Sequence, residues 1–294
     1  MARAGSEPVV PEAVCEGSAS AATADRARVR PAAPLVSVQL RHDACAVAVA
    51  ASGPLHRRSY RTALGESLLR EPSAAACVLA SPLLRRLTAA AIAGEELVLW
   101  DPFCSSGVLL LEALGVVLGQ PPGDRARKYP FASFPCHEER EYSDFLSGLR
   151  AAPHPALAGL TLLGTDGAPG ETERARRNLR RFMRRLWPPG APDDGPAEGP
   201  PSEPRLPCSV QISEGNPGQH ARRLAGRPTL LFTSLLRARS EAAASQLGRL
   251  VRQRHADWRG VFCIAEDAEG LERQTGLEWA SELRFLNRGR WAEL

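Results

Sequence analysis

The chain has 294 residues, of which 44% are hydrophobic and 24% are charged. This length and composition can bury one large core or two modest ones, and they exclude a predominantly disordered protein. The net charge of +4 and the isoelectric point near 8.8 permit a nucleic-acid partner without requiring one. Lys128 is the only lysine, so the many arginines indicate a compositional bias and their number is not used as an argument for RNA binding.

The cysteines and the most apolar stretch argue against metal and membrane chemistry. The seven cysteines form no CxxC pair and no Cys/His spacing typical of zinc, so reduced thiols and no metal site are expected. The run from Leu97 to Gly119 is interrupted by Asp101 and Glu112, which favours a buried strand followed by a helix over a membrane span. An intracellular protein is expected, with cytoplasm or organelle left open.

The first 61 residues separate into a tail, a hairpin and a connector. Residues 1–34 lack a continuous apolar segment and are predicted to be a disordered tail. Residues 35–40 and 44–50 alternate apolar and small or polar side chains around a short turn, which predicts a β-hairpin. The polar segment 55–61 is predicted to connect this hairpin to a domain spanning residues 62–294.

Within that domain, strands and helices are predicted to alternate after an initial helical segment. The helical segment is residues 73–91; the strands are 96–100, 160–165, 209–213, 229–233 and 260–265; the helices are 108–118, 171–186 and 240–255. This alternation predicts an α/β fold with a parallel sheet and crossover helices. Residues 188–207, rich in proline, glycine and acids, are predicted to be a disordered surface insert, and residues 279–286 and 290–294 to form a closing hairpin.

Two acids follow the first two strands of this pattern. Asp101 opens the turn Asp-Pro-Phe-Cys-Ser-Ser-Gly, which leads from a buried strand into a helix, where backbone N–H groups can face a ligand. The alternative is an ordinary capped turn. Asp166 ends the next strand and can accept hydrogen bonds from ribose hydroxyls, or it can cap the helix that follows.

The turn 101–107 resembles the Asp-Pro-x-Cys-Gly-Ser-Gly loop of the THUMP-associated RNA guanine-N2 methyltransferases. Further segments are similar to this family in the same order along the chain: 55–61, 69–76, 120–123, 131–135 and 283–289. The resemblance implies a Rossmann-like sheet of the S-adenosylmethionine (SAM)-dependent methyltransferase type, with a C-terminal β-hairpin and a short N-terminal hairpin before it. It also implies SAM as cofactor and RNA, ribosomal or transfer, as substrate.

The resemblance also assigns roles to individual residues. The cofactor-binding residues that it implies are Asp101, Cys104, Ser106, Gly107, Asp166 and Asn216. The residues that it places beside the reacting base are Ser234, which can accept a hydrogen bond, and Arg237, which can stack on a base.

The sequence departs from the family at three of these positions. Ser105 replaces a glycine of the loop, Asn216 stands where the family has an acid, and residues 234–237 replace Asn-Pro-Pro-Tyr. The two leucines and the missing aromatic predict inefficient amine methylation. The alternative function is therefore a catalytically inactive protein of this fold that acts as an RNA-associated or assembly scaffold.

RNA binding needs its own explanation, because the 34 residues before the hairpin cannot encode a THUMP domain. Two sources are considered: a protein partner, or a helix carrying Arg174, Arg176, Arg177, Arg180, Arg181, Arg184 and Arg185. The alternative for that helix is a solvated basic face opposite the apolar stripe of Ala175, Leu179, Phe182 and Leu186.

Overall fold

The computed structural model describes nine segments of the chain: residues 34–53, 55–56, 58–62, 69–123, 127–149, 152–186, 206–236, 240–253 and 257–294. The predicted tail, apart from Pro34, lies outside the described residues, as do most of the predicted insert and Arg237.

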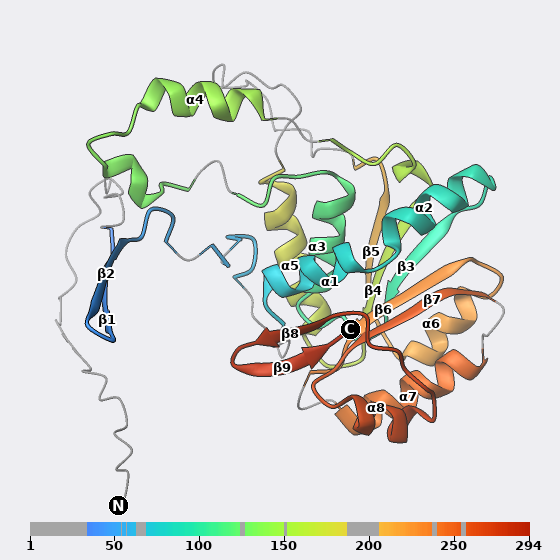
Figure 1. Cartoon of the computed structure of the whole chain (residues 1–294). Coiled ribbons are helices and arrows are strands. Elements are labelled where there is room, and N and C mark those ends of the chain that lie inside the picture. Colours follow the sequence, from blue (N-terminus) through green and yellow to red (C-terminus); the bar gives the residue numbers. More distant parts are fainter. Residues whose placement is uncertain are drawn as a thin grey trace, which may run out of the picture.

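The centre of the fold is a five-stranded, entirely parallel sheet (Figure 1). Its strands are β3 (Leu97–Asp101), β4 (Leu160–Asp166), β5 (Ser209–Glu214), β6 (Thr229–Ser234) and β7 (Trp258–Ile264). Their order in the sheet is β5-β4-β3-β6-β7. The chain runs outward from β3 through β4 to β5 and then crosses to β6. The direction of winding therefore reverses between β3 and β6, and open α/β sheets bind ligands at the carboxyl ends of such strands.

Helices cover both faces of the sheet. One face carries α1 (Glu71–Ala80), α2 (Leu83–Ile92), α3 (Val108–Val117) and α5 (Glu171–Met183); the other carries α6 (Pro217–Arg223), α7 (Ser240–Gln253) and α8 (Ala268–Thr275). Strand β3 shows why both faces are covered, since Leu97 and Leu99 pack into the first core and Val98 and Trp100 into the second. A strand that is apolar on both sides is stable only between two layers.

Two antiparallel hairpins flank the sheet, as predicted. The C-terminal hairpin consists of β8 (Arg284–Asn287) and β9 (Arg290–Glu293), and it joins the end of β7 through two hydrogen bonds of 2.8 and 2.9 Å between Ala265 and Glu293. This antiparallel addition to a parallel sheet confirms the predicted fold class, a methyltransferase-type sheet with a closing hairpin.

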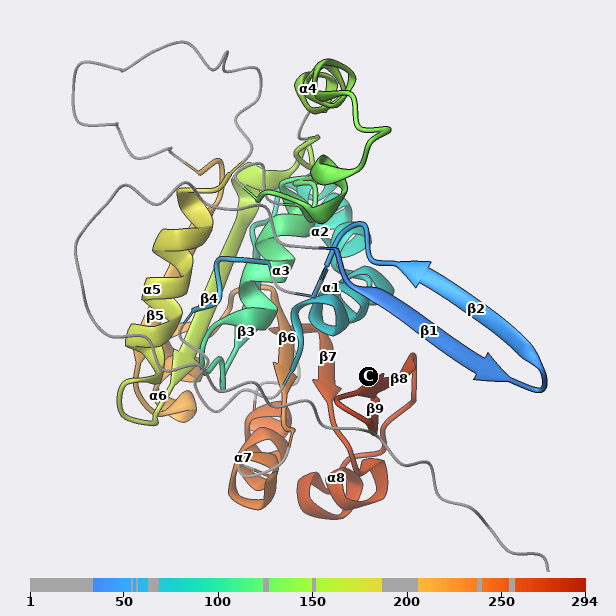
Figure 2. The ribbon, with the colours of Figure 1, turned by 90° about the vertical axis from the view of Figure 1, so that its left-hand side faces the viewer.

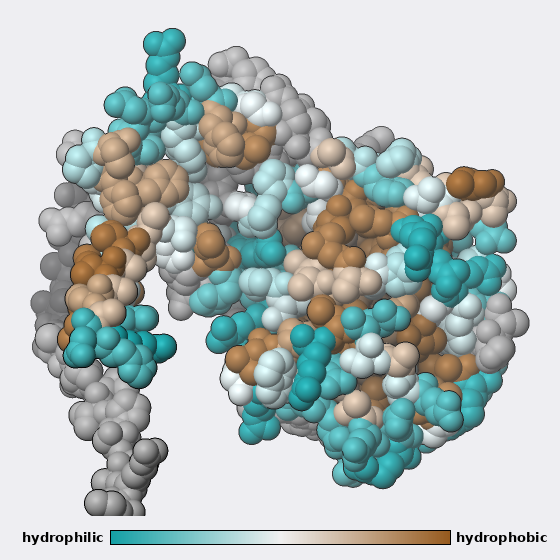
Figure 3. Space-filling view, in the orientation of Figure 1, coloured by the Kyte–Doolittle hydropathy of each residue, from teal (hydrophilic) through white to brown (hydrophobic). Residues whose placement is uncertain are grey.

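The N-terminal hairpin, β1 (Val36–Arg41) and β2 (Ala44–Val49), projects away from the domain (Figure 2). One of its faces is entirely apolar and exposed; it consists of Val36, Val38, Leu40, Cys45, Val47 and Val49. Figure 3 shows this apolar surface in brown at the edge of the molecule. Because an isolated two-stranded hairpin is marginally stable in water, such a face favours a covering partner.

The structure corrects two predicted boundaries. The helix predicted over residues 73–91 is two helices, because Ser81 is extended and Pro82 cannot continue the hydrogen-bond pattern. The closing strand begins at Arg284 rather than at Trp279, whose indole N–H donates instead to Thr275 Oγ1 at 3.0 Å.

Five helical elements beyond the predicted ones complete the described part of the fold. Besides α6 and α8, they are α4 (Glu139–Gly148), which has no buried residue, and the short 3₁₀ turns η1 (Pro130–Ser133) and η2 (Leu157–Gly159). None of the described helices is long and apolar enough to span a membrane by itself, although α1 and α2 taken together, with a bend of 47° between them, reach that length and composition.

We expect Gly164→Ala to destabilise the domain. Gly164 lies in β4 directly beneath the turn 101–107, and an added Cβ would press on the side chain of Leu110 and lie 3.1 Å from Cys104 Sγ. Overpacking of this kind costs about 1–3 kcal/mol. Chemical denaturation measures the change, and Gly148→Ala on α4, where a Cβ meets nothing within 4 Å, is the control. Equal stability of the two variants would contradict the packing described here.

Candidate functional site

The turn between β3 and α3 lies at the carboxyl edge of the sheet, where the winding reverses. Asp101, the last residue of β3, is 2% exposed, and its Oδ1 accepts hydrogen bonds from Phe103 N at 3.1 Å and from Thr233 Oγ1 at 2.7 Å. Thr233 belongs to β6. The carboxylate therefore shapes the turn and at the same time ties β3 to β6.

Asp166, at the end of β4, holds the other side of the same turn. Its Oδ2 accepts from Ser105 N and its Oδ1 from Ala168 N, both at 2.8 Å, and the residue is 2% exposed. The N-cap of α5 is Gly170, so Asp166 closes the turn before the helix and does not cap the helix itself. The contact of Asp166 with a ribose hydroxyl stays a prediction.

Ser105 has a left-handed backbone, with φ of +47°, which is the conformation that the family's glycine favours. For a residue with a Cβ this costs roughly 1–2 kcal/mol. Two hydrogen bonds offset the cost: the one from Ser105 N to Asp166, and one of 2.5 Å from Ser105 Oγ to Glu171 Oε2. Glu171 is itself buried and ion-paired with Arg174. The substituted serine thus has its own buried partners.

Ser106 and Gly107 are the residues of the turn that fit a ligand best. The Ser106 hydroxyl is buried and makes no hydrogen bond to any residue that the structure describes, although its carbonyl accepts from Asn178 Nδ2 at 2.9 Å. Gly107 has φ of +79°, and a Cβ there would lie 3.1 Å from Ala175 Cβ. An unsatisfied buried hydroxyl costs about 1–3 kcal/mol, and native proteins keep such groups mainly where function requires them.

Cys104 faces inward. It is 4% exposed and belongs to the core of the first sheet face, and its N–H donates to Thr165 O at 2.9 Å. Cys104 therefore supports the turn from below, while its predicted contact with a cofactor stays a prediction.

Asn216 follows β5, and Ser234 is the last residue of β6; both lie at the same edge of the sheet. Asn216 caps α6, since its Oδ1 accepts from Gly218 N at 2.7 Å and from Gln246 Nε2 at 3.2 Å. Ser234 is half-buried, but the next two side chains, Leu235 and Leu236, are 5% and 7% exposed and pack into the two cores. The edge thus brings together Asp101, Ser106, Gly107, Asp166 and Ser234, and leucine side chains turn inward after Ser234.

The end of the connector is buried at Tyr60 and Arg61, which the sequence did not predict. Both arginines of this part of the connector are ion-paired: Arg58 Nε with Glu112 at 3.2 Å, and Arg61 Nη1 with Glu71 at 3.7 Å. Tyr60 Oη donates to Glu112 Oε1 at 2.6 Å. The available signal was Glu112, an acid within an apolar helix that needs buried partners.

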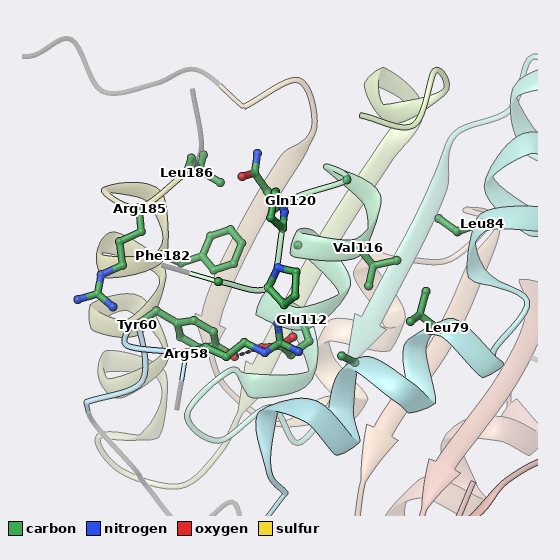
Figure 4. Close-up of a pocket in the computed structure, with 16 residues that line it drawn as sticks. Arg58, Tyr60, Leu79, Leu84, Glu112, Val116, Gln120, Phe182, Arg185 and Leu186 are labelled. Carbon is green, nitrogen blue, oxygen red and sulfur yellow. Dashed lines mark hydrogen bonds and ion pairs between the residues drawn. The ribbon is translucent and has the colours of Figure 1, made fainter. Parts of the chain in front are cut away.

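These groups line one end of a cavity of about 460 Å³ over the outer side of α3 (Figure 4). Its walls include Leu79, Val116 and Phe182, and the ring of Phe182 meets that of Tyr60 edge-on at 5.6 Å. Burial raises the pKa of the Glu112 carboxyl from an ordinary value of 4.5 to about 7, against the opposing effect of Arg58. The cavity lies away from the turn 101–107.

Among the described residues, no group of three or more His, Cys, Asp and Glu side chains is arranged to hold a metal ion. Four of the six described cysteines are buried and two, Cys45 and Cys136, are exposed; all six are reduced.

Comparison with known proteins identifies relatives that are named as RNA methyltransferases. No protein-family model matches the chain. It is 31% identical over 150 residues to a provisionally assigned RNA methyltransferase of Synechocystis, and 30% identical over 131 and 148 residues to the ribosomal RNA large subunit methyltransferase K/L of Alcanivorax borkumensis and of a Marinomonas species. These alignments cover 50%, 45% and 50% of this chain but only 36%, 18% and 20% of the relatives.

Solved structures share the fold. SMU.472, a provisionally assigned methyltransferase complexed with S-adenosylhomocysteine (SAH), matches with a TM-score of 0.59 at 19% identity, over 88% of this chain and 60% of that protein. A predicted N6-adenine-specific DNA methylase of Listeria monocytogenes matches with a TM-score of 0.56 at 17% identity, over 88% and 59%. The chain therefore has a methyltransferase fold and is similar in sequence to RNA methyltransferases.

We expect the stability of the domain to fall as pH rises through the titration of Glu112. Its pKa is higher in the folded protein, so the folded state binds more protons between 4.5 and about 7, and the free energy of unfolding decreases across that window by up to about 3 kcal/mol. Glu112→Gln, which keeps the shape of the protonated side chain, should flatten this dependence. Urea denaturation at several pH values measures it, and an unchanged pH profile in the variant would contradict the assignment.

Proposed function

We propose that this chain binds SAM at the turn 101–107 and transfers its methyl group to RNA. The observation that carries the proposal is the Ser106 hydroxyl, which is buried without a described partner. It lies in a turn that Asp101 and Asp166 hold by hydrogen bonds, at the edge of a methyltransferase-type sheet where the direction of winding reverses. The sequence similarity to RNA methyltransferases and the SAH complex of a structural relative support the same site.

The residues of the turn fit the cofactor in complementary ways. Ser106 offers a buried hydroxyl, Gly107 lets the turn pack closely against Ala175 of α5, and Asp166 would accept a hydrogen bond from a ribose hydroxyl by the family resemblance. The family resemblance places Asn216, which follows β5, near the adenine group of the cofactor. SAM supplies an activated methyl group, so the protein's contribution is to hold donor and acceptor in line.

For the acceptor we propose a guanine N2 in ribosomal or transfer RNA. Ser234 ends β6 beside β3, and its half-buried hydroxyl can accept a hydrogen bond from an exocyclic amine. Arg237, outside the described residues, would stack on the base by the same resemblance.

The second candidate is a catalytically inactive protein of this fold that acts as an RNA-associated or assembly scaffold. The observation that favours it is the burial of Leu235 and Leu236, at the positions where the family has its two prolines, with no aromatic residue beside them. The uncovered apolar face of the β1–β2 hairpin fits a protein partner, which in this case would provide the grip on RNA.

We expect the intact protein to bind SAM and SAH in calorimetric titrations, and Asp166→Ala to weaken binding at least about tenfold. The variant leaves Ser105 N and Ala168 N without their acceptor, and each such loss costs about 1–3 kcal/mol. Asp267→Ala is the matched control, because Asp267 also accepts a backbone N–H, from Gly270, but on α8. Circular dichroism verifies folding, and absence of binding by the folded intact protein would refute the cofactor site.

Methyl transfer separates the two candidates. With tritiated SAM and RNA extracted from cells as acceptor, the enzyme hypothesis predicts labelled RNA and a loss of label with Ser234→Ala at unchanged SAM affinity. Binding of SAM without any transfer to RNA would instead support the inactive scaffold.

A further inference from the structure

We infer that the outward face of α5 is a docking surface for the phosphate backbone of RNA. This inference rests on the proposed function, in that it takes RNA as the substrate, and it assigns contacts with the RNA backbone to three particular arginines. The three residues are Arg177, Arg181 and Arg184, and they are called the arginine stripe below.

The structure divides the basic residues of α5 into two groups. Arg174, Arg176 and Arg180 are neutralised within the helix: Arg174 pairs with Glu171, and Glu173 lies 3.9 Å from Arg176 and 3.0 Å from Arg180. Arg176 also donates to the carbonyl of Ile212 in β5 at 2.8 Å. These cations are held by the fold and are poorly placed to meet a ligand.

The arginine stripe has no such partners. Its residues are spaced i, i+4 and i+7, so they lie on one side of the helix, and all three side chains are exposed. None of them makes an ion pair or hydrogen bond with a residue that the structure describes. The opposite side of the helix carries Ala175 and Phe182, which pack toward the core as the sequence predicted.

It is this separation, and not the number of arginines, that points to a ligand. The two acids of α5, Glu171 and Glu173, pair with Arg174, Arg176 and Arg180, which leaves the arginine stripe without a counter-charge among the described residues. Three unpaired guanidinium groups in a row repel one another, and a polyanion relieves that repulsion. Guanidinium also matches phosphate in geometry and forms two parallel hydrogen bonds with it.

The position of the stripe relative to the turn 101–107 fits a strand of RNA that approaches the proposed site. Helix α5 begins at Glu171, which accepts the hydrogen bond from Ser105, and Arg177 follows about 9 Å along the axis. The stripe itself extends about 10 Å, which is roughly three nucleotides of a stacked strand at about 3.4 Å each. The stripe thus leads away from the turn along α5, on the same face of the sheet as α3.

The test compares the intact chain with two triple variants that lose equal charge. The first is Arg177→Gln/Arg181→Gln/Arg184→Gln; the control is Arg222→Gln/Arg223→Gln/Arg249→Gln, whose exposed arginines lie on α6 and α7 across the sheet. Fluorescence anisotropy with a labelled single-stranded RNA of mixed sequence, and with the same RNA as a hairpin, is measured over a range of salt concentrations. Calorimetry with SAH is run on all three proteins.

The stripe variant should bind both RNAs at least about tenfold more weakly at low salt. The magnitude of the slope of log K against log salt should decrease by about 2 for the single strand, because each of the three lost phosphate contacts contributes about 0.7. The control variant should keep most of the affinity. Equal weakening in the two variants would overturn the inference by showing that net charge alone matters, and so would the absence of RNA binding by the intact chain. SAH binding, unchanged in the stripe variant, reports separately on the cofactor site.

Discussion

The hydrogen bond from Ser105 N to the carboxylate of Asp166 is the interaction on which the proposed site depends. It joins the turn after β3 to the end of β4 and holds a serine in the left-handed conformation that a glycine would adopt more easily. The second bond of Ser105, to Glu171, extends the same network to the first residue of α5. Three elements of one sheet edge are thereby fixed around the turn, and the Ser106 hydroxyl is left within it without a described partner.

The rest of the fold keeps this edge in place. Asp101 accepts a hydrogen bond from Thr233 of β6 at the point where the winding reverses. A ligand at the turn would therefore lie at the end of β3, which is hydrogen-bonded to β4 on one side and to β6 on the other. Beneath it, Gly164 leaves room for Cys104 to reach the core. The acceptor side is built differently from the cofactor side, because Leu235 and Leu236 are packed inward after Ser234.

Much of the fold was predictable because its signals are local. The alternation of apolar strands with amphipathic helices indicated the parallel sheet. The turn of one acid and small residues indicated the carboxyl edge, where Asp101 and Asp166 both accept hydrogen bonds from the backbone of that turn. What could not be predicted depends on contacts between distant residues. The partners of Glu112, 52 and 54 positions away in the sequence at Tyr60 and Arg58, are invisible to periodicity. Short helices such as α8, of eight residues, are too brief for a helical period, although the cap at Asp267 was a usable signal.

The most direct test of the account is a crystal structure of the chain grown with SAH. The account predicts that the ligand lies against the turn 101–107, in contact with Ser106 and Gly107, with Asp166 still bonded to the backbone of Ser105. A ligand bound elsewhere, for example in the cavity beside Phe182, or a turn without ligand at saturating SAH, would contradict it.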